Sequence, residues 1–190
     1  MTLLIAGLIV FLGIHTLTTL RETRQAAINR LGEGGYKMLY SAIALAGLVM
    51  IIYGFGQYRA SGYIQVWEPP RGLRHLTMLL MWLSFIMLVA AYVPPGKIKA
   101  TLKHPMLVAV KTWALAHLLV NGDLGSLILF GSLLAWAVYD RISVKRRTAG
   151  EPLQTVNGIQ MGDGLAISIG TVLFGIMLVA HSRLIGVSVF

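Results

Sequence analysis

Six apolar stretches, separated by short segments rich in arginine, lysine, glycine and proline, dominate the 190-residue chain. Each approaches the length that a helix needs to cross a bilayer and carries few or no charges. Only 12% of the residues are charged, whereas a soluble domain has about 25%. This composition excludes most soluble enzymes. The six stretches are Thr2–Leu20, Tyr36–Tyr58, Leu76–Val93, Pro105–Val120, Gly125–Tyr139 and Gly164–Val189.

The stretches predict one membrane domain over residues 1–190, an all-α polytopic bundle of about six transmembrane helices. The pairs Pro69-Pro70 and Pro94-Pro95 bracket the third stretch and end helices there. The first, third and fifth connections carry eleven Lys and Arg residues, and the second and fourth carry three. Because cytoplasmic connections are enriched in Lys and Arg, we expect the odd connections in the cytoplasm and both termini on the non-cytoplasmic side. The net charge of +9 is then mainly an orientation signal and no sign of nucleic-acid binding.

The fourth and fifth stretches are short for a membrane span. Fifteen residues of helix reach roughly 22 Å, less than the ~30 Å hydrocarbon core. If the Lys111 amine reaches the inner interface, the turn Asn121-Gly122-Asp123 lies below the outer surface, which requires protein or a wet cavity around it. The alternative is a hairpin in a locally thinned bilayer.

Few ionisable residues lie inside the stretches: His15, Lys111, His117 and, near the outer edge, His181. Each is a functional candidate because burying it in lipid is costly. No Asp or Glu lies inside a stretch, and the absence of intramembrane carboxylates argues against a proton-coupled transporter.

His15 and His117 lie on separate apolar helices, where a neutral imidazole is a suitable axial ligand for haem iron. Arg21, Arg24, Lys111 and His104 are the candidate partners of the haem carboxylates. The alternative is that each histidine only hydrogen-bonds a neighbouring helix. Sharing one iron requires the short fourth span, because full-length spans separate the two histidines by more than ~10 Å in depth.

Other notable residues have simpler expected roles. We expect structural roles for His75 and His181, and a helix start at His104-Pro105. The tryptophans are expected mainly as interfacial anchors, and the glycines at positions 32, 34 and 35 as a hinge.

Two segments resemble the NnrU family: Ile14-His15-Thr16-Leu17-Thr18-Thr19-Leu20-Arg21 with Leu31-Gly32-Glu33-Gly34-Gly35-Tyr36, and the block from Lys103-His104-Pro105-Met106 to Asn121-Gly122-Asp123. The resemblance covers nearly the whole chain. It implies a bacterial inner-membrane protein associated with denitrification, the respiration of nitrite and nitric oxide. The family also includes ζ-carotene isomerases, membrane enzymes that use haem b to convert a cis double bond to trans.

The resemblance further implies that the isomerase's two axial histidines match His15 and His117. A cysteine proposed to exchange as ligand in the isomerase corresponds here to Ala114, and the chain has no cysteine. Three readings stay open. The first is a haem-b protein supporting nitrogen-oxide respiration with a redox partner. The second is a haem-dependent isomerase of an apolar polyene such as ζ-carotene, and the third is a structural membrane protein without a cofactor.

Overall fold

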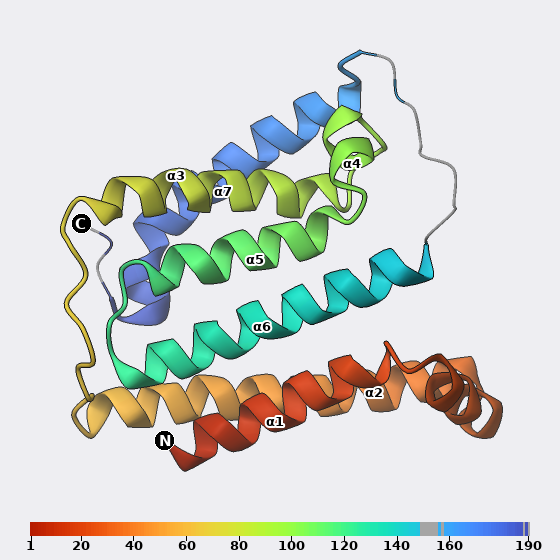
Figure 1. Cartoon of the computed structure of the whole chain (residues 1–190), viewed down its shortest axis with the longest axis horizontal. Helices are drawn as coiled ribbons and strands as arrows, with labels where there is room; N and C mark the ends of the chain where they lie inside the picture. Colours follow the sequence, from red (N-terminus) through yellow and green to blue (C-terminus); the bar gives the residue numbers. More distant parts are fainter. Residues whose placement is uncertain (149–155, 157, 188, 190) are drawn as a thin grey trace. The chain divides into compact units, whose positions relative to one another are not determined.

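The computed structural model describes residues 1–148, 156, 158–187 and 189, and these residues contain seven helices (Figure 1). They divide into two compact units, and each is described by itself. The first unit comprises Met1–Pro69 and Asn121–Thr148, and the second comprises Pro70–Val120 with the described residues after Thr148. The expected all-helical architecture is confirmed.

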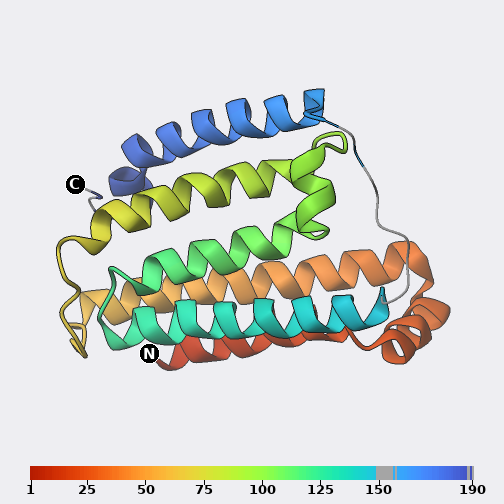
Figure 2. The same ribbon diagram turned by 45° about the horizontal axis from the view of Figure 1, so that its top comes forward.

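The first unit is built from α1 (Thr2–Leu17), α2 (Arg21–Ala60) and α6 (Leu124–Arg147). Helix α1 packs along α2 and also contacts α6. The view in Figure 2 shows α1 and α6 following the long part of α2. Leu4, Leu8 and Ile51 are buried between the helices, whereas Ile9, Leu45 and Ile52 are largely exposed. An apolar exterior of this kind is suited to lipid.

Glycines let α1 approach α2 closely. A Cβ built on Gly47 would lie 2.7 Å from the Phe11 backbone nitrogen. A Cβ on Gly54 would collide with the backbone of Leu3 and Leu4. Small residues at such contacts bring helix backbones together in membranes, where packing rather than the hydrophobic effect drives association.

Helix α2 starts much earlier than the sequence predicts. The arginine-rich first connection is not a loop, because Arg21–Leu31 is already helical. A kink follows at Gly32, whose φ of 72° and ψ of 163° lie outside the helical region and are accessible to glycine. The chain therefore bends at Gly32, whereas Gly34 and Gly35, expected with it in a loop, lie inside the helix, and the polar segment before the kink forms a separate helical arm.

The turn before α6 is paired with another segment of the same unit. The Gly122 carbonyl accepts from the backbone N–H groups of Val66 and Trp67 at 2.9 and 3.1 Å. The Leu124 N–H donates to the Ile64 carbonyl at 2.9 Å. The irregular backbone of the turn thus lies against protein, as a submerged turn would require. Its depth stays a prediction.

The prediction that the fifth helix is short is wrong. Helix α6 continues from Leu124 to Arg147 because the charged residues after Tyr139 extend it. Asp123 caps its start, where the carboxylate accepts from the Ser126 N–H at 2.9 Å. The helix formed by the fourth apolar stretch is short, as expected. This helix, α5, spans Pro105–Leu118, with His104 at its N-cap position.

The second unit contains α3 (Leu73–Ala90), α4 (Lys97–Leu102), α5 and α7 (Met161–Ile185). Helix α3 packs against both α5 and α7, and Figure 2 shows it between them. Hydroxyl groups tie it to α5: Thr77 Oγ1 donates to the Ala116 carbonyl at 3.1 Å and Ser84 Oγ to the Ala109 carbonyl at 2.9 Å. The third connection, expected as a loop, contains the short helix α4.

Asp163 joins the starts of α4 and α7. Its buried carboxylate accepts from the backbone N–H groups of Lys97 and Ile98, both at 2.8 Å, and of Gln160 at 2.9 Å. A carboxylate that accepts backbone N–H groups at helix starts also complements the helix dipoles. Gly96 makes room for it, since a Cβ there would lie 2.6 Å from Asp163 Cγ.

The protein is a multi-pass membrane protein. Four described helices are long and apolar enough to cross a bilayer, namely α2, α3, α6 and α7. Helices α1 and α5 are apolar but shorter. All six expected apolar stretches therefore form helices, with ends that differ from the predicted ones by several residues.

Replacing Gly54 by alanine should destabilise the first unit, because the added methyl group meets the α1 backbone. Overpacking of this kind costs about 1–3 kcal/mol. Gly56→Ala is the matched control on the same helix, since a Cβ there meets nothing within 4 Å. Alanine is the better helix former by up to about 1 kcal/mol, so Gly56→Ala should be neutral or stabilising. Equal unfolding free energies for the two variants in mixed micelles would contradict the close α1–α2 approach.

Asp163→Ala should lower the melting temperature in detergent more than Asp123→Ala. The first variant leaves three backbone N–H groups of two helix starts without their acceptor, and the second removes the acceptor of one. Thermal unfolding followed by circular dichroism measures both. An equal or smaller effect at position 163 would show that the two helix starts do not depend on this carboxylate.

Candidate functional site

His15 lies half-buried in the last turn of α1. Its Nδ1 is 2.6 Å from the Phe11 carbonyl oxygen, four residues earlier. A carbonyl only accepts hydrogen bonds, so Nδ1 carries a proton, and the neutral tautomer with this bond has its lone pair on Nε2. This is the tautomer that a metal-ligating histidine needs, with Nδ1 held by a backbone carbonyl.

Aromatic rings from all three helices of the first unit surround the His15 imidazole. The Phe11 centroid lies 4.2 Å from that of His15. The rings of Tyr40 on α2 and Trp136 on α6 both stand edge-on at 5.5 Å. Their packing fixes the orientation of the imidazole and gives it an apolar wall.

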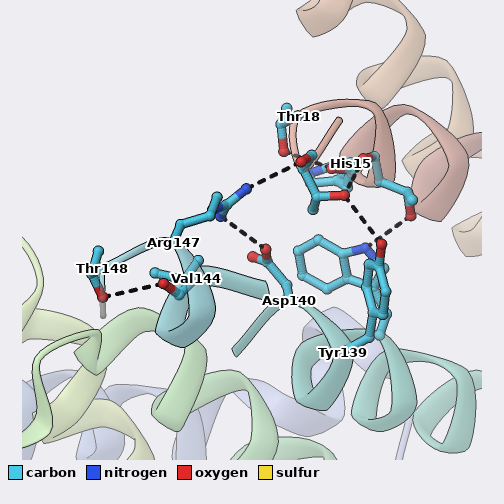
Figure 3. Close-up of polar contacts among 10 residues, drawn as sticks. His15, Thr18, Tyr139, Asp140, Val144, Arg147 and Thr148 are labelled. Atoms are coloured by element: carbon cyan, nitrogen blue, oxygen red, sulfur yellow. Dashed lines mark hydrogen bonds and ion pairs between the residues drawn. The ribbon is translucent and has the colours of Figure 1, made fainter. Parts of the chain in front are cut away.

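A chain of polar contacts continues from His15 toward the end of α6 (Figure 3). Thr18 Oγ1 donates to the His15 carbonyl at 2.6 Å. The hydroxyls of Thr19 and Tyr139 are 3.4 Å apart. Arg147 donates to the Thr19 carbonyl at 3.3 Å and forms an ion pair with Asp140 at 3.7 Å. These contacts satisfy the open carbonyls at the end of α1.

His117 repeats the local geometry of His15 in the second unit. It lies in the last turn of α5, and its Nδ1 is 2.9 Å from the Trp113 carbonyl oxygen, again four residues earlier. The Trp113 ring centroid is 5.0 Å from that of His117. The same argument places the proton on Nδ1 and the lone pair on Nε2. That the two histidines bind one iron stays a prediction.

The expected carboxylate partners have different settings. Arg21 is exposed at the first position of α2. The Arg24 guanidinium lies 5.8 Å from the Tyr36 ring centroid, a cation–π distance. Lys111 is half-buried at the middle of α5, and His104 occupies its N-cap position. Lys111 precedes His117 by six residues, or about 9 Å of helix.

The structure brings Arg24 close to the wall of the His15 ring. Both Arg24 and Tyr40 line a cavity of about 380 Å³, together with Tyr36 and Thr18. The Tyr36 hydroxyl is buried and has no hydrogen-bond partner among the residues that the structure describes. An unpaired buried hydroxyl is costly, and this one belongs to a residue that lines the cavity.

Sequence reasoning missed the aromatic residues around His15. Trp136 was expected as an interfacial anchor, yet its Nε1 donates to Thr16 Oγ1 on α1 at 3.2 Å. Tyr36 and Tyr40 are four residues apart, which places both rings on one helix face. That spacing was the available signal. His181, expected to be structural, has its Nδ1 2.8 Å from the Val187 carbonyl oxygen.

Within the described residues, no group of three or more His, Cys, Asp or Glu side chains is placed to hold a metal ion. His15 and His117 each offer one ring nitrogen, the donor that an axial histidine supplies to a metal already held in a macrocycle.

The sequence matches the family model described as NnrU protein over residues 3–189. Comparisons with curated proteins and with solved structures gave no match.

The hydrogen bond between Trp136 and Thr16 should couple the two side chains energetically. Trp136→Phe and Thr16→Val each remove it, and the double variant removes it only once. A double-mutant cycle on the free energy of unfolding should give a coupling of about 0.6–1 kcal/mol. Strictly additive effects would show that α6 does not hold the end of α1 through this contact.

Proposed function

The chain belongs to the NnrU family, and from this premise we propose that it is an integral membrane protein that binds haem b through His15 and His117. The candidate partners of the haem carboxylates are Arg21, Arg24, Lys111 and His104. We further propose that the protein resides in the bacterial inner membrane and supports nitrogen-oxide respiration, as the resemblance implies.

The observation that carries the proposal is the shared geometry of the two histidines. Each ring has Nδ1 hydrogen-bonded to the carbonyl four residues earlier, so each neutral ring has its lone pair on Nε2. Two such histidines on apolar helices fit an axial ligand pair.

The surroundings of His15 are also suitable. Phe11, Tyr40 and Trp136 pack against the imidazole and hold its plane. Arg24, in the cavity beside Tyr40, offers a guanidinium to a carboxylate. When bound, haem b supplies a redox-active iron, and the protein sets its potential through the ligands and the polarity around them.

Electron transfer, sensing or a maturation role is favoured over isomerisation. Ala114, the position of the isomerase's exchanging cysteine, is fully buried and has no thiol. The described ligand candidates are histidines, which remain firm ligands when the iron changes its oxidation state. A reaction that needs one coordination position to open is therefore poorly served by this chain.

Purified protein, expressed with adequate haem supply, should show the oxidised and reduced visible spectra of a bis-histidine b-type haem. His15→Ala and His117→Ala should each change this spectrum or abolish haem retention, and His75→Ala should leave it unchanged. Added imidazole should restore the spectrum of an alanine variant that still folds, because it replaces the missing ligand. A colourless wild-type protein would overturn the proposal and leave the structural reading.

The isomerase alternative is tested with the same preparation. Haem-loaded protein should leave 15-cis ζ-carotene unchanged under reducing conditions. Conversion that is lost in His15→Ala would replace the respiratory proposal by the isomerase.

A further inference from the structure

We propose that a cavity at the arginine-rich end of the first unit binds the phosphate headgroup of an anionic phospholipid. The site contains none of the candidate axial ligands, and it shares Arg21 with the candidate partners of the haem carboxylates. It lies where the end of α1 and the start of α2 face the last two turns of α6. Figure 3 shows the contacts of Tyr139 and Arg147, two of the residues on its α6 side.

The cavity has a volume of about 700 Å³. Residues 19–23 line one side, and residues of α6 from Tyr139 to Arg147 line the other. This volume exceeds what one inorganic anion needs and falls in the range of small-molecule sites. A headgroup with part of its glycerol backbone is an occupant of suitable size.

The charge of the cavity is positive. Arg21, Arg146 and Arg147 line it, and Glu22 is the acidic residue among its lining residues. Asp140 lies behind the wall and pairs with Arg147. The lining therefore carries two net positive charges, which suits a phosphate ester. Guanidinium groups bind phosphate oxygens through paired N–H donors.

Arg147 is held in place, whereas the other two arginines are exposed. It donates to the Thr19 carbonyl and pairs with Asp140, so its guanidinium is ordered before a ligand arrives. Hydroxyl groups of Thr23 and Ser143 add neutral donors to the same lining. A positioned arginine surrounded by hydroxyls lowers the ordering cost of binding an anion.

The edge of the cavity is apolar, and this favours a lipid over free phosphate. Leu20 is 49% exposed and Ile142 is 46% exposed, and both line the cavity. Tyr139, at the end of the apolar part of α6, is also exposed. Tyrosines are common at the membrane interface. Acyl chains can follow this apolar surface while the phosphate reaches the arginines, as in basic lipid sites between membrane helices.

The test measures binding of phosphatidylglycerol and phosphatidylcholine to the delipidated full-length protein in detergent by native mass spectrometry. Wild-type protein should prefer phosphatidylglycerol. The double variant Arg21→Gln/Arg146→Gln should weaken its binding by roughly tenfold to thirtyfold, since each basic residue contributes about one factor of five. Arg147 is left intact because its ion pair with Asp140 is structural.

The matched control is Arg30→Gln/Lys145→Gln, which removes the same two charges from exposed positions that do not line the cavity. It should change the affinity by less than a factor of about two. Circular dichroism melts check that both double variants are folded. Equal weakening in the two double variants would overturn the site in favour of general charge attraction.

Two competition arms identify the ligand. Millimolar inorganic phosphate should fail to displace phosphatidylglycerol, because it lacks the apolar contacts. Full displacement would assign the cavity to a free anion and overturn the lipid. Displacement by stoichiometric haem would assign the cavity to haem carboxylates and would likewise overturn it. Equal binding of phosphatidylcholine is a further contradicting result. The haem proposal is tested separately, by the spectra of the His15→Ala and His117→Ala variants, which leave every residue of this cavity intact.

Discussion

Backbone polar groups at membrane depth must find their partners within the protein, and most of this structure follows from that constraint. The helices satisfy it along their length. Where helices end, side chains and neighbouring segments take over: the Gly122 carbonyl is paired with Val66 and Trp67, and the Asp163 carboxylate binds the starts of α4 and α7. Hydroxyls of Thr77 and Ser84 add second donors to carbonyls that are already helical. Several of the polar side chains thus hydrogen-bond to the protein's own backbone.

The two histidines belong to the same pattern but differ in consequence. By donating to the carbonyl of Phe11 or Trp113, each ring satisfies its own polar hydrogen within the apolar helix. The same bond leaves the second nitrogen as a base and a metal ligand. A device that a membrane helix needs for stability therefore also prepares the imidazole for chemistry. This double use explains why the intramembrane position of the histidines and their candidate role are linked.

Much of the fold could be predicted from the sequence, because apolar length, prolines and Gly32 act locally. The helical arm Arg21–Leu31 could not, since a polar helix outside the bilayer has the hydropathy of a loop. The candidate histidines followed from their cost in lipid. Their neighbours did not: the contact of Trp136 with Thr16 joins residues 120 positions apart, and only the packing of α6 on α1 brings them together. The spacing of Phe11 and His15, four residues apart on one helix, could have indicated one ring of the aromatic wall.

The Asp163 carboxylate links positions far apart in the chain. Its carboxylate occupies the space that a side chain at position 96 would need. The acid at position 163 and the glycine at position 96 therefore constrain each other. In related sequences a larger residue at position 96 should be found only where the acid at 163 has been lost or shortened. A change at position 163 alone removes the acceptor of two helix starts, and a larger residue at position 96 alone collides with the carboxylate. The two positions are therefore expected to change together.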